Sequence, residues 1–134
     1  MKTTLYVCLL AVLVLAQGQH PHTPAAGSWE GDLEGVRAVT VNLRGPEQRL
    51  DGGVVFYILK DEGSGFHTGA ASAEVPMEGL RRNGDVVRFW VRGSNGEPIS
   101  FEMRITEPGH ARLTRLKSGA TPELTVALWR QTEN

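Results

Sequence analysis

Cysteine is almost missing from this chain, which has one among its 134 residues. That residue, Cys8, lies in an apolar N-terminal run, so the chain that follows has no thiol for a disulfide, a metal site or nucleophilic catalysis. Small domains exported to oxidising compartments usually carry disulfides. Their absence favours a bacterial envelope or secreted protein stabilised by its core alone. The roughly 115 residues after that run can bury roughly two-thirds of their unfolded surface, which makes such a core feasible.

An excess of charge is missing as well. The chain has 14 Lys and Arg against 15 Asp and Glu, a formal net charge of −1, and Arg81-Arg82 is its one adjacent basic pair. Proteins that bind nucleic acids or anionic membranes concentrate positive charge on one face. We therefore expect neither nucleic acid nor an anionic membrane surface as a partner.

A long apolar run occurs only at the N-terminus, over residues 5–15. Lys2 precedes it and small and polar residues follow it, which is the layout of a secretory signal peptide, and the run is short for a membrane span. We expect a signal peptide over residues 1–18 that is cleaved after Gly18, with cleavage after Ala16 as the alternative. The mature protein would then be secreted or periplasmic, without stable membrane insertion. A retained membrane anchor is the competing interpretation.

Helical periodicity is absent from the rest of the chain. Residues 19–27, QHPHTPAAG, are proline-rich and aperiodic, and we expect them to form a flexible leader. From residue 28 onward, short β-type runs alternate with turn residues, with longer turn-rich loops at 45–53 and 61–72, a pattern typical of an all-β sandwich or barrel. We expect a single domain over residues 28–132 with eight strands, at 28–34, 37–44, 54–60, 73–81, 85–92, 98–106, 110–116 and 123–131.

Alternation along two neighbouring runs predicts the register of a central hairpin. Ser94-Asn95-Gly96 is read as a three-residue loop in which Gly96 takes the left-handed conformation. The expected inward pairs are Val91 with Ile99, Phe89 with Phe101 and Val87 with Met103, and Arg88 faces Glu102 on the outside.

The preceding hairpin has two interpretations. A three-residue loop at 82–84 places Glu78 opposite Arg88, which then lies between Glu78 and Glu102 on the outer face. A two-residue Asn83-Gly84 turn shifts the register by one residue and turns Glu78 toward the core, where a buried carboxylate would be a candidate site. We prefer the first interpretation because it agrees with the neighbouring hairpin.

Three neighbouring strands thus have one apolar and one charged face. The apolar face of an antiparallel meander needs a covering layer or must curl into a barrel. The sequence therefore predicts an all-β fold, an eight-stranded antiparallel up-and-down barrel. A barrel of this size is filled by its own side chains or encloses one small ligand.

The start of the first strand, Gly27-Ser28-Trp29, resembles the G-x-W signature of the lipocalin-like (calycin) superfamily. The resemblance implies a barrel with one closed end, where Trp29 is the plug and a basic residue of the last strand, here Arg130, packs against it. The chain lacks the helix and the disulfide that those proteins often carry. The same start, with VPMEGLRRNGDVVRFWV further on, also resembles small exported bacterial domains that sometimes precede a hydrolase domain.

Strand phase decides whether Trp29 and Arg130 meet. In a closed meander the first strand pairs with the last, so the beginning of one lies beside the end of the other. The preferred phase of the last strand turns Leu124, Val126, Leu128 and Arg130 inward. The competing phase turns Ala127 and Trp129 inward and leaves Arg130 in water.

Signatures of catalysis, metal binding and cofactor binding are lacking. Ser64 and His67 lie close together, but in a Gly-rich run without the strand-to-helix elbow of a nucleophilic serine. Metal sites need three or four converging ligands, whereas His67 and His110 stand apart and His20 and His22 lie in the expected leader. The start of the domain also resembles nitrobindin-like haem barrels, but His110, the one candidate ligand, lies in a turn. We expect no catalytic residue, no metal and no cofactor.

Ligand contact is expected from inward side chains. The candidates are Phe56, Ile58, Met77, Phe89, Phe101, Met103 and Arg115, with Tyr57 and Leu59 replacing the first two in the other strand phase. An inward charge such as Arg115 reads an acid group on a ligand or extends to the rim, and the apolar candidates otherwise form a plain core.

The leading hypothesis is an exported, non-enzymatic binding module for a small apolar molecule. The alternative is a solid barrel that binds a protein partner through its outer surface or its VVFYILK strand, and an enzymatic or hydrolase-associated domain comes third.

Overall fold

The computed structural model describes residues 23–61, 63 and 65–132, so the expected signal peptide, His20 and His22 lie outside the described residues. The described chain is all-β and contains no helix. Its strands are β1 (Gly27–Leu33), β2 (Val36–Arg44), β3 (Asp51–Asp61), β4 (Phe66–Ala71), β5 (Val75–Pro76), β6 (Glu78–Asn83), β7 (Val86–Arg92), β8 (Pro98–Glu107), β9 (His110–Arg115) and β10 (Leu124–Arg130).

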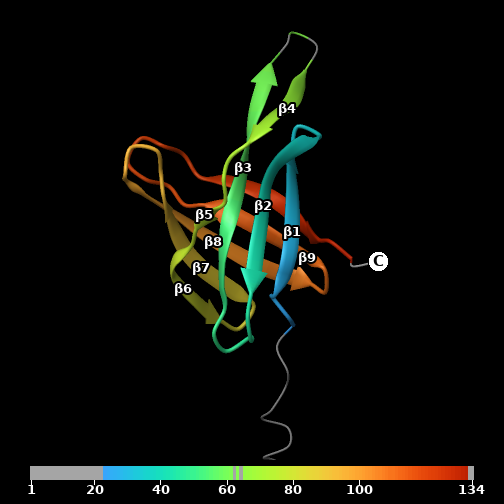
Figure 1. The fold of residues 1–134 in the computed structure, drawn as a ribbon, viewed down its shortest axis with the longest axis vertical. Coiled ribbons are helices and arrows are strands. Elements are labelled where there is room, and N and C mark those ends of the chain that lie inside the picture. Colours follow the sequence, from blue (N-terminus) through green and yellow to red (C-terminus); the bar gives the residue numbers. More distant parts are fainter. Residues whose placement is uncertain (1–22, 62, 64, 133–134) are drawn as a thin grey trace, which may run out of the picture.

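These strands form one antiparallel sheet that is curled into a half-barrel. The hydrogen-bonded order is β4-β3-β2-β1-β10-β9-β8-β7-β6, and β5 pairs with β3 outside this path. Figure 1 shows β1, β2 and β3 as a front layer that crosses β6 to β9 behind it, with the β3–β4 hairpin projecting past the other strands. The two layers enclose the apolar face that the sequence pattern predicts.

Two differences separate the ten described strands from the eight expected ones. Residues 66–71, which we expected within a loop, form β4 and pair with the end of β3. The expected strand at 73–81 is divided into β5 and β6, with Met77 between them. The sequence pattern did not predict β4 because its small and polar residues show no alternation of apolar and polar positions.

The register of the central hairpin is confirmed. Val91 pairs with Ile99, Phe89 with Phe101, Val87 with Met103 and Arg88 with Glu102. Gly96 has the expected positive φ of 83°, and Gly96 N donates to Gly93 O at 2.9 Å. The alternation of apolar and polar residues was enough to predict this register because β7 and β8 pair without a bulge.

The preferred register of the preceding hairpin is wrong, and so is its alternative. Asn83 pairs with Val86 around a two-residue Gly84-Asp85 turn, in which Gly84 adopts the positive φ of 61° that such a turn requires. Further along, the register shifts at a bulge that contains Gly79, whose φ is 62°. A Cβ atom on Gly79 would lie 2.7 Å from Trp90 Nε1, so glycine is required both by φ and by this approach.

The expected ion-pair chain on the outer face changes accordingly. Arg88 keeps Glu102 at 3.7 Å, but Glu78 lies opposite Trp90 and pairs with Arg92 at 3.4 Å. The prediction that Arg88 bridges two glutamates is therefore wrong. The Glu78 side chain is 41% exposed, so it does not form the buried carboxylate of the alternative register.

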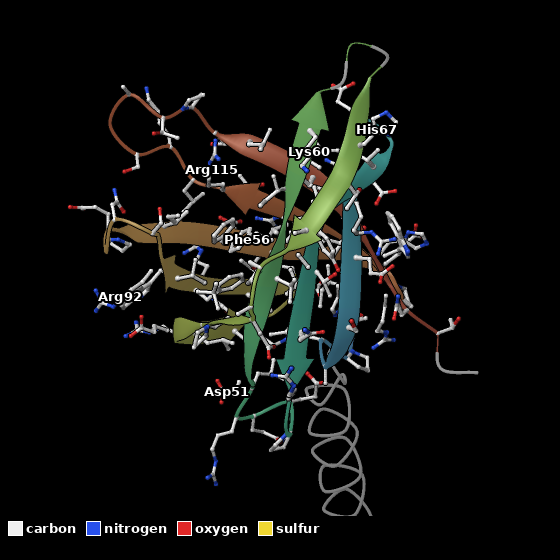
Figure 2. All side chains as sticks on the ribbon, turned by 45° about the horizontal axis from the view of Figure 1, so that its top comes forward. Asp51, Phe56, Lys60, His67, Arg92 and Arg115 are labelled. Carbon is white, nitrogen blue, oxygen red and sulfur yellow. The ribbon has the colours of Figure 1, made fainter. Side chains whose placement is uncertain are left out.

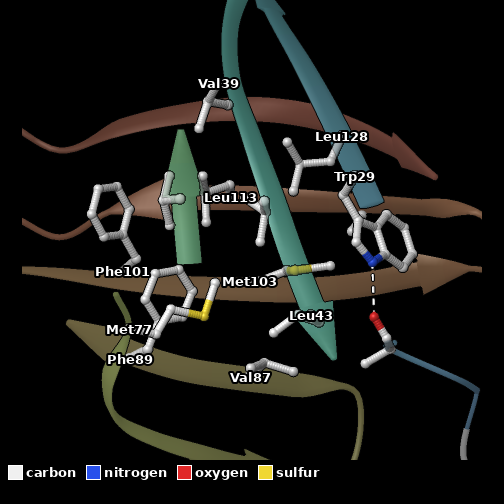
Figure 3. Packing of buried hydrophobic residues seen from close by; sticks show 14 of the residues in the cluster. Trp29, Val39, Leu43, Met77, Val87, Phe89, Phe101, Met103, Leu113 and Leu128 are labelled. Atoms are coloured by element: carbon white, nitrogen blue, oxygen red, sulfur yellow. Dashed lines mark hydrogen bonds between the residues drawn. The ribbon is translucent and has the colours of Figure 1, made fainter. Parts of the chain in front are cut away.

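The core lies between the two layers and is built from the inward residues of all the long strands (Figure 3). Val41, Val54, Val87, Val91 and Met103 are completely buried. Phe89 stacks on Phe101 with ring centroids 5.5 Å apart. Burial of a side chain of this size contributes about 1.5–3 kcal/mol, so the core supplies the stability that disulfides supply elsewhere.

One end of the half-barrel is covered around Trp29, which is fully buried. Trp29 pairs with Arg130 across β1 and β10, as the preferred strand phase predicts, and the Arg130 guanidinium carbon lies 5.5 Å from the centroid of the indole. Figure 3 shows the indole at the end of the core, with its Nε1 donating to Ala25 O at 2.8 Å. A Cβ atom on Gly27 would lie 2.8 Å from the Arg130 side chain, so glycine leaves the room that Arg130 occupies.

Residues 23–26, which the sequence places in the expected leader, contact this end. The Glu47 carboxylate accepts hydrogen bonds from the backbone of Ala25 and Ala26 at 3.1–3.2 Å. It also pairs with Arg82 at 2.6 Å, and Arg82 donates to Thr23 O. Arg82 points inward because the Gly79 bulge and the Gly84-Asp85 turn place it opposite Val87.

Candidate functional site

A cavity of about 530 Å³ lies at the end of the half-barrel away from Trp29. Strand direction defines this end: β1, β7 and β9 finish here, and β2, β8 and β10 begin here. The cavity is lined by Leu33, Ala38, Val39, Phe56, Val75, Val91, Arg92, Gly93, Ser94, Ile99, Phe101, Leu113, Arg115, Leu124 and Val126. Its volume is within the range of about 300–1,000 Å³ that small-molecule sites occupy.

The inner part of the cavity is aromatic. Phe56 on β3 and Phe101 on β8 face each other with ring centroids 6.1 Å apart, and Phe101 stacks on Phe89 below. Phe56 is only partly buried, whereas Phe89 and Phe101 are 3% and 5% exposed. Aromatic surface left accessible within a concave wall is suited to an apolar ligand.

Among the described residues, the charged lining consists of two arginines, Arg92 and Arg115, and includes no acidic side chain. Figure 2 shows both on the same side of the molecule as Phe56. Arg92 is engaged elsewhere: its Nε lies 3.4 Å from a Glu78 oxygen, and its guanidinium carbon lies 5.2 Å from the centroid of Trp90.

Arg115 is the less satisfied of the two. It follows Ala111 and Leu113, both 3% exposed, in the inward phase of β9, and it pairs with Phe101. Its Nη2 donates to Pro122 O at 3.3 Å. Within the described chain, Arg115 Nε is the one buried side-chain nitrogen or oxygen without a hydrogen-bond partner.

The structure separates the expected ligand-contacting residues into three groups. Phe56, Phe101 and Arg115 line the cavity. Met77, Phe89 and Met103 are at most 6% exposed and belong to the packed core. Ile58 does not line the cavity; it is 59% exposed on the part of β3 that pairs with β4.

Several lining residues were not singled out from the sequence. Ile99 and Leu113 lie in the inward phase of their strands, as expected, but phase does not reveal which end of the structure stays open. Leu33 and Val75 reach the cavity through irregular regions: β1 has a register shift after Gly31, and β5 is two residues long. One signal in the sequence could have found these residues: they lie at strand ends that an up-and-down meander brings to the same end of the structure.

Acidic residues on β1 form a separate cluster on the outer surface. Arg37 lies 2.7 Å from Glu30 and 2.9 Å from Asp32, and its guanidinium carbon lies 5.4 Å from the centroid of Trp129. Burial alone would lower the pKa of Arg37, but hydrogen bonds and attraction to Asp32 and Glu30 raise it above its ordinary value. The acids therefore neutralise a fixed cation, and they form no free acid–base pair.

Other reactive groups do not assemble into a site in the described part of the chain. His110 begins β9 and is exposed, and Ser64 lies outside the described residues. Among residues 23–61, 63 and 65–132, no group of three His, Cys, Asp or Glu side chains could hold a metal ion. That part of the chain also has no helix of a length and apolarity suited to crossing a membrane.

Comparison of the chain with protein-family models, with curated proteins and with solved structures finds no match. The cavity is therefore interpreted from its own geometry and chemistry.

Proposed function

We propose that this domain is a non-enzymatic binding module that holds a small, mainly apolar molecule in the cavity between Phe56, Phe101 and Val126. The observation that carries the proposal is the cavity of about 530 Å³ with a largely apolar wall, at the end of an otherwise tightly packed core. A ligand there would cover the exposed part of the Phe56 ring. Each Å² of apolar surface removed from water contributes roughly 25 cal/mol before the costs of association.

The proposal includes a closed, lipocalin-like barrel of eight strands. β5 pairs with β3, β6 pairs with β7, and Met77 alone separates β5 from β6. Met77 N also donates to Gly52 O at 3.0 Å. If β5 and β6 count as one bulged strand, the circuit β1-β2-β3-β5/β6-β7-β8-β9-β10 has eight members and β4 is an added arm. The G-x-W start at Gly27–Trp29 supports the same architecture.

Binding of the neutral fluorescent dye N-phenyl-1-naphthylamine tests the proposed function. Val126 lines the cavity, whereas its neighbour Ala127 is exposed on the outer face of β10. We expect saturable binding to the wild type, at least tenfold weaker binding to Val126→Trp, and unchanged binding to Ala127→Trp. Unfolding curves establish that both variants are folded. Equal affinity of the two variants, or no saturable binding by the wild type, would contradict the proposal.

We also propose that the domain acts outside the cytoplasm, on the basis of the apolar run and small residues of positions 1–18. Expression of the full chain in a bacterial host, followed by cell fractionation and N-terminal sequencing, tests this. Protein that begins at residue 17 or 19 in the periplasm or medium is expected. An intact N-terminus in the cytoplasm would contradict export.

Protein recognition is a second candidate function, favoured by the β3–β4 arm. β4 ends the sheet path, so one of its edges has no neighbouring strand within the described chain, and Ile58 beside it is 59% exposed. Such edges accept an extended segment of another protein. Cross-linking in extracts of the native host, compared between the wild type and Ile58→Glu, tests this function without involving the cavity.

A further inference from the structure

We infer that the cavity selects amphiphiles with one anionic head group, and that Arg115 is the residue that reads this group. The inference deepens the proposed function and rests on it. It starts from the contrast between a wall of apolar side chains and the single guanidinium within that wall that has no ion-pair partner among the described residues.

Placement of Arg115 is a consequence of strand phase. Ala111 and Leu113 are buried on the inner face of β9, so the residue two positions further also points inward. Arg115 pairs with Phe101 on one side and with Leu124 on the other, so apolar side chains flank it on both neighbouring strands. A guanidinium in this position cannot reach water with all of its donors.

Among the described residues, Pro122 O is the one hydrogen-bond acceptor of the Arg115 side chain. Nη2 is held by Pro122 O at 3.3 Å, and Nε is buried without a partner. Leaving a buried donor unpaired is unfavourable, and native structures rarely do so without a reason. The guanidinium fork matches two oxygens of one carboxylate or sulfate, which is a geometry that an ammonium group does not offer.

Charge in the rest of the wall favours an anion over a cation. The lining residues that the structure describes include no Asp or Glu, and their second charged residue, Arg92, is already paired with Glu78 and stacked over Trp90. An anionic head would therefore meet Arg115 without a competing carboxylate in the lining, and the tail would lie against Phe56 and Phe101. A neutral head group such as a hydroxyl would accept a hydrogen bond from Arg115 but would not neutralise its charge.

Calorimetric titration with decanoate, decyl sulfate and decanol tests this inference on the wild type. The three probes share one alkyl tail and differ in the head group. We expect decanoate to bind at least tenfold more tightly than decanol. Decyl sulfate then shows whether the site takes any oxyanion or a carboxylate only. Equal affinity for decanoate and decanol would overturn the inference while leaving the proposed function intact, whereas no binding of any probe would overturn both.

Substitutions of two arginines on β9 test whether Arg115 is the residue that produces the preference for decanoate over decanol. Arg115→Gln should bring the decanoate-to-decanol affinity ratio close to one and leave decanol affinity within about twofold, and Arg115→Lys should retain part of the preference. Arg112→Gln is the matched control, since it removes the same charge from an exposed position on the same strand. A ratio that survives in Arg115→Gln, or that falls equally in Arg112→Gln, would show that Arg115 does not read the head group.

Discussion

The two ends of the half-barrel use inward-pointing arginines in opposite ways. At the end around Trp29, Arg130 covers a buried indole and donates to Ala26 O at 3.2 Å, and Arg82 is paired with Glu47 at 2.6 Å. At the cavity end, Arg115 stands among apolar side chains with a buried Nε that has no partner. The same residue type thus contributes to the fold where carbonyl and carboxylate oxygens converge, and is available for recognition where they do not.

This contrast separates the contacts that stabilise the fold from the residues of the proposed binding site. The covered end is held by side chains from β1, β6, β10 and the β2–β3 loop, and by backbone groups of residues 23–26. The cavity end is bounded largely by apolar residues at strand termini and by the Gly93–Ser94 corner. Mutations at the first end should therefore act on folding, and mutations at the second should act on ligand affinity.

Removal of Trp29 should have the largest effect on stability. Its side chain is fully buried, and truncation of a buried aromatic residue to alanine costs about 3–5 kcal/mol. Trp29→Ala should lower the free energy of unfolding in urea by that amount. Because this variant could fail to fold, Trp29→Phe provides a milder test, with a loss of about 1–3 kcal/mol that includes the hydrogen bond to Ala25 O. Unchanged stability of Trp29→Phe would refute the role of the indole.

Removal of Arg130 should have the next largest effect. Arg130→Ala should lower the free energy of unfolding by about 1–3 kcal/mol, because the variant loses hydrogen bonds to carbonyl oxygens and the contact over the indole. Tryptophan emission should also change in a Trp90→Phe, Trp129→Phe background, in which Trp29 is the remaining fluorophore. An unchanged melting temperature together with unchanged emission would show that Arg130 does not cover Trp29.

Substitutions of two glycines, one in β6 and one in the turn that follows it, should test the bulge that turns Arg82 inward at the covered end. Gly79 and Gly84 have similar φ values of 62° and 61°, but a Cβ atom would approach Trp90 only at Gly79. Gly79→Ala should therefore cost about 1–2 kcal/mol in the free energy of unfolding, and Gly84→Ala about 1 kcal/mol. Equal losses in thermal denaturation would mean that the Trp90 contact relaxes without cost.

Replacement of Arg115 should have the smallest effect on stability. Arg115→Met keeps an unbranched stem as far as the position of Nε and removes a buried donor that has no partner, which offsets the loss of the hydrogen bond to Pro122 O, so the free energy of unfolding should stay within about 0.5 kcal/mol of the wild type. Urea denaturation without ligand measures this. A loss as large as that in Arg130→Ala would erase the distinction between the two ends.

Local alternation in the sequence determined the all-β class and the register of β7 and β8, and it favoured the phases that bring Arg130 to Trp29 and turn Arg115 inward. These features follow from the two-residue period of a strand, which each strand carries in its own residues. Strand phase also identified Phe101 as an inward aromatic residue, but it left Phe56 and Tyr57 as alternatives on the third strand, and the structure places Phe56 in the cavity wall.

Only the tertiary structure decided the register of β6, the formation of β4 and the position of the cavity. The bulge at Gly79 turns Arg82 inward, where Glu47, which lies 35 residues earlier, pairs with it, and β4 pairs with the edge of β3. The cavity remains where strand ends leave Phe56 only partly buried, while residues 23–26, Trp29 and Arg130 cover the opposite end. The turn residues alone do not distinguish two registers that differ by one residue. The difference in free energy between such registers arises from contacts between distant strands, and the residues of one strand do not specify those contacts.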